Sequence, residues 1–189
     1  MNYTSLKNNF FTDGNYTIEP FREKDKLSIK EWRNQQMDVL RQKKVLTDED
    51  QVNYYKNYIE PSFSQKYPGI ILFSFLERDI CIGYGGLTNI DWENLHVELS
   101  FLVNPDRLFN EDLYEEDFSM FIKFMKHVTF DELSFNRIFT ETYDIRSHHI
   151  NTLLQNGFQL EGRMREHIFI NNKFADSLIH GFLKKDYNG

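Results

Sequence analysis

The stretch Leu153–His167, which reads LLQNGFQLEGRMREH, decides how the rest of the chain can be organised. Its first residues continue an apolar helical pattern that stops at Asn156-Gly157, because glycine readily takes the left-handed conformation that ends a helix. Phe158 then opens a strand pattern with four charged residues, Glu161, Arg163, Arg165 and Glu166. A helix that leads directly into a strand indicates a protein in which the two kinds of element alternate.

Further strand patterns precede this stretch. Residues 69–76 (GIILFSFL) and 80–90 (ICIGYGGLTNI) form two apolar runs around a charged turn, which predicts a hairpin. Residues 96–103 (HVELSFLV) and 137–143 (RIFTETY) each predict a further strand. Between these two, residues 114–130 have the apolar periodicity of a long helix, and a parallel pair of strands needs a crossover of that kind.

The N-terminal part of the chain is more polar. Residues 16–21 predict a short strand, and residues 25–40 predict one or two short helices. Residues 48–59 predict a helix that Thr47 caps and that Pro61 ends, since proline removes a backbone donor and restricts the residue before it.

Together these patterns predict an α/β (α+β) fold with a mixed, mostly antiparallel central sheet of six or seven strands, flanked by helices. Residues 158–183 complete the sheet with a final hairpin around the turn NNK. We expect a single domain over residues 1–189, in which residues 1–15 are a flexible or additional N-terminal segment. Glycines 83, 85 and 86 lie inside a strand pattern, which indicates close packing and argues against a dinucleotide-binding fold.

The composition argues against several classes of function. The net charge of -7 at pH 7 disfavours nucleic acid as a partner, because a phosphate backbone attracts a basic surface. Cys81 is the single cysteine, so the sequence has no disulfide framework and no metal-ligand spacing, and it favours a reducing compartment. No segment approaches the roughly eighteen apolar residues of a membrane helix. We therefore expect a cytoplasmic protein with no metal, nucleic acid or membrane partner.

Five segments carry a family resemblance: IKEWRN (29–34), IGYGGL (82–87), VELSFLVNP (97–105), NRIFTETYDIRSHHINTLLQNGFQLEGRMREH (136–167) and FADSLIHGFLKKDY (174–187). They resemble the GNAT superfamily of acyl-CoA-dependent N-acyltransferases over nearly the whole chain. The last two are similar to the branch that contains the ribosomal-protein alanine acetyltransferases and their amino-sugar-modifying relatives. The resemblance implies an enzyme that transfers the acetyl group of acetyl-CoA, its co-substrate, to a primary amine.

The resemblance also implies where the co-substrate binds. In this family the strands that correspond to residues 96–103 and 137–143 run parallel and splay apart at one end, where they hold the pantetheine arm. The pyrophosphate lies at the start of the following helix, whose amides and dipole favour an anion. The residues expected to bind acetyl-CoA are therefore Leu102, Val103, Asn110, Leu113, Tyr114 and His149.

Glu98 and His96 are the candidate catalytic residues. They are two positions apart on a predicted strand, so their side chains point to the same face. The resemblance adds that relatives often take their proton acceptor from this strand, and a partly desolvated carboxylate can serve as a general base. We expect Glu98, directly or through a water held with His96, to accept the proton of the acceptor amine.

The sequence departs from the family pattern in two places. Relatives usually have a basic, glycine-rich turn after Pro105, whereas this chain has no glycine there and Arg107 is the only cation among several carboxylates. The tyrosine that some relatives use to protonate the departing thiolate is replaced by Leu153. These departures leave open a GNAT-fold module that binds a partner without catalysis.

The expected acceptor is a small-molecule amine, most of all an amino sugar or a nucleotide-linked amino sugar. Aromatic and basic side chains within residues 32–58 would cover the acceptor cleft, where rings can stack on a sugar and cations can contact a phosphate. The expected substrate-binding residues are Trp32, Arg33, Tyr54, Tyr143 and Arg163, although Arg163 can equally brace the sheet. A protein N-terminus is the alternative acceptor, and we expect a monomer or a homodimer.

Overall fold

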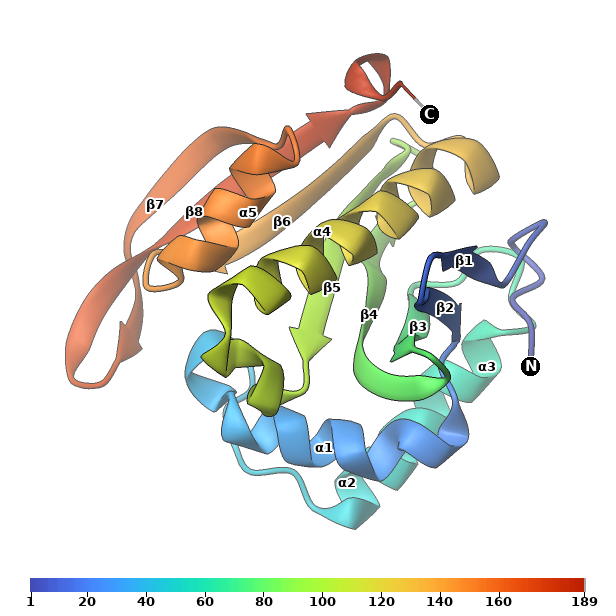
Figure 1. Cartoon of the computed structure of the whole chain (residues 1–189), viewed down its shortest axis with the longest axis horizontal. Coiled ribbons are helices and arrows are strands. Elements are labelled where there is room, and N and C mark those ends of the chain that lie inside the picture. The colour runs from blue at the N-terminus through green and yellow to red at the C-terminus, as the bar shows by residue number, and fades with distance from the viewer. Residues whose placement is uncertain (189) are drawn as a thin grey trace.

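The computed structural model describes residues 1–188, which form one eight-stranded sheet flanked by helices (Figure 1). The strands are β1 (Phe11–Asp13), β2 (Tyr16–Pro20), β3 (Ile71–Glu77), β4 (Ile80–Asp91), β5 (His96–Val103), β6 (Arg137–Tyr143), β7 (Gln159–Ile170) and β8 (Lys173–Leu183). Their order in the sheet is β1-β2-β3-β4-β5-β6-β8-β7. Only the β5–β6 pair is parallel, so the predicted mixed and mostly antiparallel fold is confirmed.

The helices are α1 (Lys26–Gln35), α2 (Asp48–Tyr54), α3 (Glu60–Ser62), α4 (Glu111–His127) and α5 (Ser147–Gln155). Short 3-10 turns lie at η1 (Glu23–Asp25), η2 (Met37–Val39), η4 (Pro105–Phe109) and η6 (Lys184–Asp186), and π-turns at η3 (Tyr55–Ile59) and η5 (Val128–Glu132). Within residues 1–188, no helix has the length and apolar character needed to cross a membrane.

The sheet has eight strands, one more than the six or seven expected, because residues 11–13 form β1. This short strand pairs with β2 across a tight turn, in which Gly14 has a φ of 58°. The sequence shows no apolar alternation at β1, so the pattern alone missed it. The residues before β1 also pack on the domain: Tyr3 is buried, and its hydroxyl group is hydrogen-bonded to both backbone groups of Leu72 at 2.8 Å.

The helix that begins after Thr47 does not end at Pro61. Thr47 caps its start, as the sequence predicted, and the structure adds Asp50 as the second member of a capping box. The chain then widens into the π-turn η3 and continues as α3, with Pro61 near the start of this last turn. Proline is tolerated in the first turn of a helical segment, where its missing N–H would have no partner in any case.

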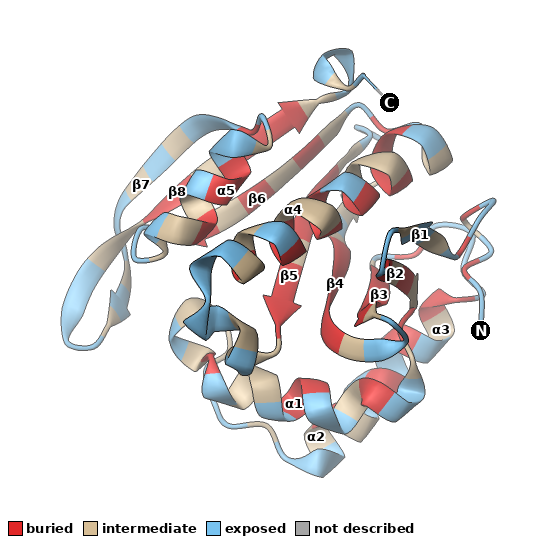
Figure 2. Ribbon diagram, in the orientation of Figure 1, coloured by how far each residue is buried: buried red, intermediate tan, exposed pale blue. Residues whose placement is uncertain are grey.

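One part of the core lies between the sheet and α4, which crosses in front of β4 and β5 (Figures 1 and 2), and the core also includes buried residues of α1 and η3. Phe118 of α4 stacks on Phe101 of β5 with 4.8 Å between ring centroids. Gly85 of β4 lets α4 pack this close to the sheet, because a Cβ atom at position 85 would lie 2.9 Å from the ring of Phe121, which also belongs to α4. In contrast, β7 forms the outer edge of the sheet and is mostly exposed (Figure 2).

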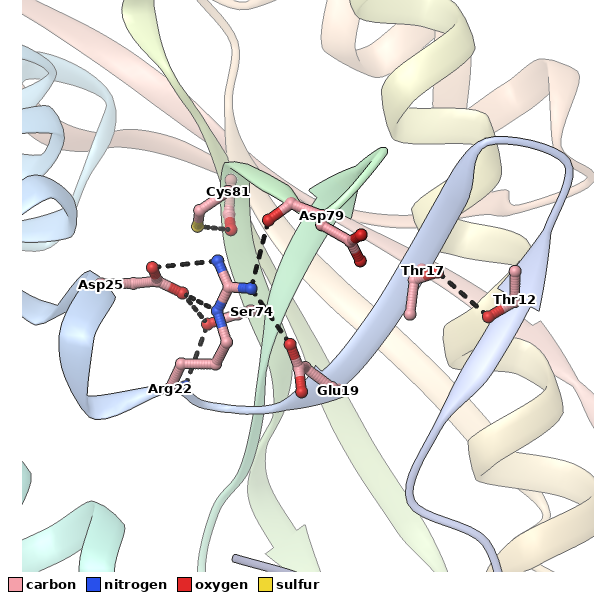
Figure 3. Close-up of polar contacts among 9 residues, drawn as sticks. Thr12, Thr17, Glu19, Arg22, Asp25, Ser74, Asp79 and Cys81 are labelled. Carbon is pink, nitrogen blue, oxygen red and sulfur yellow. Dashed lines mark hydrogen bonds and ion pairs between the residues drawn. The ribbon is translucent and has the colours of Figure 1, made fainter.

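A network around Arg22 anchors the start of α1 to the sheet (Figure 3). The Arg22 guanidinium donates to Asp25 at 2.6 Å and to Glu19 at 3.1 Å, and its backbone N–H donates to the Ser74 hydroxyl at 3.0 Å. The neighbouring Cys81 is not a reactive thiol, since burial raises its pKa to about 12. The network holds α1 against β3, and α1 brings Arg33 to the site described below.

Strands β5 and β6 separate after their first three residues. The parallel ladder joins His96 to Arg137 and ends at the pair of Glu98 and Phe139. Beyond that pair, β5 stays hydrogen-bonded to β4, and β6 to β8. The predicted parallel pairing and splay of these two strands are therefore confirmed, and a gap opens between them.

Candidate active site

A cavity of about 180 Å³ lies at this gap. Residues of β4, β5, β6, α1, α4, α5 and the segments after α1 and before α5 line it: Arg33, Val39, Leu40, Arg41, Thr88, Glu98, Leu99, Ser100, Phe101, Phe118, Thr140, Glu141, Arg146 and His149. Two carboxylates, three arginines and one histidine thus line one half-open cavity. Buried charges of this kind must be paired, and their pairing shows how the site is arranged.

Glu98 and Glu141 share one guanidinium. Arg41 donates to a Glu98 carboxylate oxygen at 2.6 Å and to Glu141 at 2.7 Å. Asn89 of β4 also donates to Glu98, and the Ser177 hydroxyl donates to Glu141 at 2.6 Å. Only 8% of the Glu98 side chain is exposed, whereas 52% of the Arg41 side chain is, so the cation closes the cavity from the solvent side.

His96 makes contacts different from those of Glu98. Its Nε2 lies 3.4 Å from an Asp91 carboxylate oxygen, and its ring packs edge-on against Phe139 with 5.8 Å between centroids. The Nδ1 atom is enclosed without a hydrogen-bond partner among the described residues. His96 does not line the cavity that Glu98 lines. Of the two catalytic residues predicted from the sequence, Glu98 lines the cavity and His96 does not.

The backbone of β5 offers free hydrogen-bonding groups to the gap. In an antiparallel ladder, alternate residues direct both their N–H and C=O groups to the partner strand. The N–H of Asn104 donates to Ile82 of β4, so by alternation Leu102 also faces β4, and Phe101 and Val103 face the gap. The last rung of the β5–β6 ladder uses the N–H of Leu99, so only its carbonyl is open to the gap. Gln36 already donates to the Val103 carbonyl at 2.9 Å. Of the two backbone contacts expected for CoA, the one at Leu102 is thus occupied by the sheet.

The start of α4 is already capped by the protein. The Asn110 side chain accepts from the Leu113 amide at 3.1 Å, and the Asn110 carbonyl accepts from the Tyr114 amide at 3.0 Å. Among the described residues, the amides of Glu111 and Asp112 have no acceptor. An anion at this helix end would therefore bind the amides of Glu111 and Asp112, because those of Leu113 and Tyr114, the residues expected to bind it, are already hydrogen-bonded.

Arg107 is not free to bind an anion. Its guanidinium donates to the fully buried Asp117 carboxylate at 2.7 Å and to Glu77 at 3.1 Å. Arg107 thus ties η4 to α4 and to β3. The cation nearest to the cavity on this side is Arg146, which precedes the first turn of α5.

Arg146, Tyr114 and His149 form a hydrogen-bonded chain with a defined direction. Arg146 can only donate, and it does so to the Tyr114 hydroxyl at 3.2 Å. The Tyr114 oxygen lies 2.6 Å from Nδ1 of His149, and we assign the hydroxyl as the donor of this hydrogen bond, because the same oxygen already accepts from Arg146. Burial lowers the pKa of His149 well below its ordinary value, and the charge of Arg146 lowers it further. A neutral imidazole that accepts at Nδ1 carries its proton on Nε2.

The Nε2–H of His149 is available at the cavity. The ring stacks on Phe118 with 4.2 Å between centroids, and its opposite edge is bonded to Tyr114. Nε2 has no hydrogen-bond partner among the described residues, and it is not sealed off from solvent, so a ligand can reach it. His149 therefore presents a neutral hydrogen-bond donor to the cavity that it lines.

Four of the five expected substrate-binding residues, all but Arg163, lie in three different places. Arg33 lines the cavity and also borders a neighbouring aromatic pocket of about 390 Å³, to which Tyr54 contributes a ring stacked on Tyr58. Trp32 packs partly buried against the hydrophobic core. Tyr143 borders a surface pocket with Arg41 and Glu141.

Arg163 lies away from the cavity. Its guanidinium donates to Asp144 and Asp176 at 2.6 Å each, and so joins the loop after β6 to the edge hairpin β7–β8. Glu161, on the same strand, also pairs within the sheet, with Arg137 of β6. These charges brace the outer strands, which is the second of the two roles considered for Arg163.

Comparison with known proteins identifies the family. A model of the acetyltransferase (GNAT) domain matches residues 18–179. The chain belongs to the GNAT acetyltransferase family. The predicted superfamily and the predicted class of enzyme, an acyltransferase, are thereby confirmed.

Solved structures of GNAT proteins have a similar fold. One is spermidine N-acetyltransferase from Vibrio cholerae in complex with CoA and spermine, with a TM-score of 0.80 and 16% identity over 92% of this chain and 98% of that chain. A dodecameric structure of the Vibrio cholerae enzyme in an intermediate state has a TM-score of 0.73 and 18% identity, over 93% of this chain and 97% of that chain. A protein described as a probable acetyltransferase has a TM-score of 0.72 and 20% identity, over 94% of this chain and 98% of that chain.

Sequence reasoning missed part of this GNAT site. Asn89 and Ser177 received no role, although each bonds to a carboxylate of the cavity. The sequence makes Glu141 a further candidate base beside Glu98, and it is the only charged residue inside the otherwise uncharged run 138–143. The sequence predicts Arg41 as one of the cations over the acceptor cleft, where it would contact a phosphate, but not its pairing with two carboxylates, since its loop shows no periodicity that would place the side chain.

Proposed function

We propose that the protein transfers the acetyl group of acetyl-CoA to a primary amine on a small, positively charged acceptor of the polyamine kind. The observation that carries this proposal is the pair of carboxylates, Glu98 and Glu141, held at the cavity by one half-exposed guanidinium. An acceptor with charged amino groups can take the place of Arg41 on these two carboxylates. Structural likeness to an enzyme described as a spermidine N-acetyltransferase supports the same class of acceptor.

A cationic acceptor fits the cavity better than the amino sugar expected from the sequence. The residues expected to stack on a sugar do not gather at the carboxylates, because Trp32 packs on the core and Tyr54 belongs to a separate pocket. Carboxylates that form charge-assisted hydrogen bonds select ammonium groups over hydroxyl groups. We therefore place the amine of the acceptor next to Glu98 and a second positive group next to Glu141.

The residues at the gap suit acetyl-CoA as the co-substrate. The free carbonyl of Leu99 and the free N–H and C=O groups of Phe101 match the amide-rich pantetheine arm, which would extend the edge of β5 as a strand does. The open amides of Glu111 and Asp112 and the guanidinium of Arg146 would face the pyrophosphate. The acidic side chains of this helix start weaken that contact, so most of the affinity would come from the pantetheine.

The chemistry requires a proton acceptor for the amine and donors for the charge that develops on the thioester. Glu98 would take one proton from the acceptor ammonium, directly or through water, so that the neutral amine can attack the acetyl carbon. Nitrogen forms the new bond, the bond from carbon to sulfur breaks, and the second amine proton passes to the departing thiolate or to water. The Nε2–H of His149 would donate a hydrogen bond to the thioester group, as a neutral imidazole can without changing its protonation state.

Initial rates on a panel of acceptors test the proposal. We would measure the release of CoA thiol from acetyl-CoA with spermidine, a simple diamine, glucosamine and a peptide with a free N-terminus. The expected order is polyamine and diamine well above glucosamine and peptide. Glu141→Gln should raise the KM for the polyamine and leave the affinity for acetyl-CoA unchanged in calorimetry. A preference for glucosamine or for the peptide would contradict the proposed acceptor, and absence of acetyl-CoA binding would contradict the activity.

A further inference from the structure

A second pocket, with a volume of about 390 Å³, lies next to the cavity that holds Glu98. Helices α1 and α2 lie side by side (Figure 1), and the pocket is bounded by α1, by one face of α2 and η3, and by the chain at Phe21 and Tyr84. Among the described residues, Arg33 alone lines both spaces. We call the second space the α2 pocket. Its volume lies within the range of roughly 300–1,000 Å³ that is usual for small-molecule sites.

Gln51 of α2 is a buried amide that the protein leaves unpaired. Only 3% of the residue is exposed, yet its side chain has no hydrogen-bond partner among residues 1–188. Neither of its amide atoms is sealed off by protein, so both are accessible from the α2 pocket that Gln51 lines. Buried amides are normally hydrogen-bonded, because an unpaired polar group loses its bonds to water without replacement. Gln51 therefore offers a donor and an acceptor, side by side, to a ligand in the pocket.

Aromatic rings form the walls of the α2 pocket. Spacings of three and four residues place Gln51, Tyr54 and Tyr58 on one face of the helix, where it widens into the π-turn η3. The rings of Tyr54 and Tyr58 stack with 5.5 Å between centroids, although 38% and 63% of these residues are exposed. On the inner side, Phe21 packs edge-on against Tyr84 with 6.0 Å between centroids, and both are buried. A planar ligand can stack on such a surface.

Arg33 gives the α2 pocket a positive charge that no carboxylate neutralises. Its Nε atom donates to Gln42 at 3.0 Å, and one terminal nitrogen donates to the Tyr84 hydroxyl. Within residues 1–188, no carboxylate lies within ion-pair distance of this guanidinium. The other terminal nitrogen has no partner among the described residues and is not sealed off from solvent. A partly buried cation with neutral partners favours an anion at its free side.

Asp50 does not offset this charge. It is the one carboxylate among the described residues that line the α2 pocket. It accepts from the Thr47 amide at 3.0 Å and from the Lys44 ammonium at 2.9 Å, and these bonds lower its pKa to about 2. A polyamine would therefore find no free carboxylate here and would be repelled by Arg33. The α2 pocket thus has the opposite charge preference from the cavity of Glu98 and Glu141.

We propose that the α2 pocket is a binding site for a nucleoside monophosphate. The base lies against the rings of Tyr54 and Tyr58, which stack on a base of any kind. Its edge is hydrogen-bonded to Gln51, since a carboxamide matches the adjacent donor and acceptor of a nucleobase. The phosphate binds the free side of Arg33, because a guanidinium fork pairs with phosphate oxygens. Neither Glu98 nor Glu141 takes part, so this site does not depend on the proposed acetyl transfer.

Calorimetric titration of the full chain with AMP and with UMP tests the proposal. Both titrations are run with and without saturating acetyl-CoA, because acetyl-CoA itself carries an adenine nucleotide. At least one of the two probes should bind with a dissociation constant below about 1 mM, whether or not acetyl-CoA is present. The matching nucleoside, adenosine or uridine, should bind roughly tenfold more weakly, since it has no anion for Arg33. Absence of binding by both probes, or loss of their binding when acetyl-CoA is present, would overturn the proposal.

Two substitutions locate the bound nucleotide. Gln51→Met keeps the volume and the helix propensity but removes the amide, so it should raise the dissociation constant roughly fivefold. Its thermal midpoint should not fall, because Gln51 gives up no hydrogen bond within the protein. Tyr54→Leu should raise the dissociation constant by about 5- to 150-fold, the range found when a stacking ring is removed.

Tyr67→Leu is the matched control for the loss of a ring. Tyr67 is also an exposed tyrosine, packed edge-on against Trp92 with 5.3 Å between centroids, and it lies outside the α2 pocket. The control should bind the nucleotide as the natural protein does. Unchanged affinity in Gln51→Met or in Tyr54→Leu would overturn the proposal, since the base would then lie elsewhere. A failure of acetyl-CoA to bind would contradict the proposed acetyl transfer alone, because the same variants still locate the nucleotide without it.

Discussion

Replacing Glu98 by glutamine is expected to slow acetyl transfer roughly a hundred-fold or more, the scale on which the loss of a general base acts. Glutamine has nearly the same shape as glutamate, and its side-chain oxygen can still accept the hydrogen bond from Asn89. It cannot take up the proton of an amine. The change thus removes basicity at the floor of the cavity and leaves the packing there intact.

The fold should tolerate this change. Arg41 loses its bond to Glu98 but keeps the bond of 2.7 Å to Glu141, and 52% of its side chain is already exposed. Glutamine leaves no unpaired charge in the buried position, and the half-exposed guanidinium stays solvated, so the change should cost about 1 kcal/mol or less. For a chain of this length, such a loss lowers the melting temperature by about 4 °C at most. The reduced rate therefore cannot be attributed to unfolding at 25 °C.

The assay measures single-turnover transfer from acetyl-CoA to a verified amine, detected as the release of CoA thiol. Calorimetry confirms that acetyl-CoA still binds. Glu77→Gln is the matched control, because Glu77 is also a strand carboxylate paired with an arginine, Arg107 at 3.1 Å, but lies outside the cavity. The control should retain its turnover. Near-natural turnover in Glu98→Gln would refute the base assignment and direct attention to Glu141.

Three further changes test other parts of the reasoning. Arg41→Ala should lower the KM for a cationic acceptor, since it removes the cation that competes for the buried carboxylate of Glu98 and for Glu141, and an unchanged or higher KM in initial-rate measurements would contradict the displacement of Arg41. Burial lowers the folded-state pKa values of His149 and His180. Below a pH of about 6.5, the unfolded chain therefore binds protons that the folded chain does not. The free energy of unfolding should then fall by up to about 1.4 kcal/mol per pH unit for each histidine. Urea unfolding at pH 7.5 and 5.5 checks this, and His149→Gln should reduce the slope. Gly85→Ala should destabilise the fold by about 1–3 kcal/mol, because the added Cβ would lie 2.2 Å from a carbonyl oxygen of β5, whereas Gly162→Ala meets open space and should change the unfolding midpoint little.

Local patterns of this sequence determined most of the elements. The apolar runs around Arg78 and Asp79 predicted the β3–β4 hairpin, and both turn residues take the positive φ that a two-residue hairpin turn requires. The long helix between β5 and β6 predicted their parallel pairing, because no shorter connection permits it. Gly157 ended α5 at a φ of 79°, as its place after an apolar helix indicated.

Only the tertiary structure decided which charged groups meet. Arg41 comes from a loop whose sequence has no period, yet it bridges a carboxylate of β5 and one of β6 that lie 57 and 100 residues away along the chain. The role of Arg163 was also undecided in the sequence, because a long side chain on an edge strand can turn to either side, and two aspartates from neighbouring segments settled it. The side-chain periodicity of a helix or strand follows from its local backbone geometry. The pairing of charges depends instead on segments that only the fold brings together.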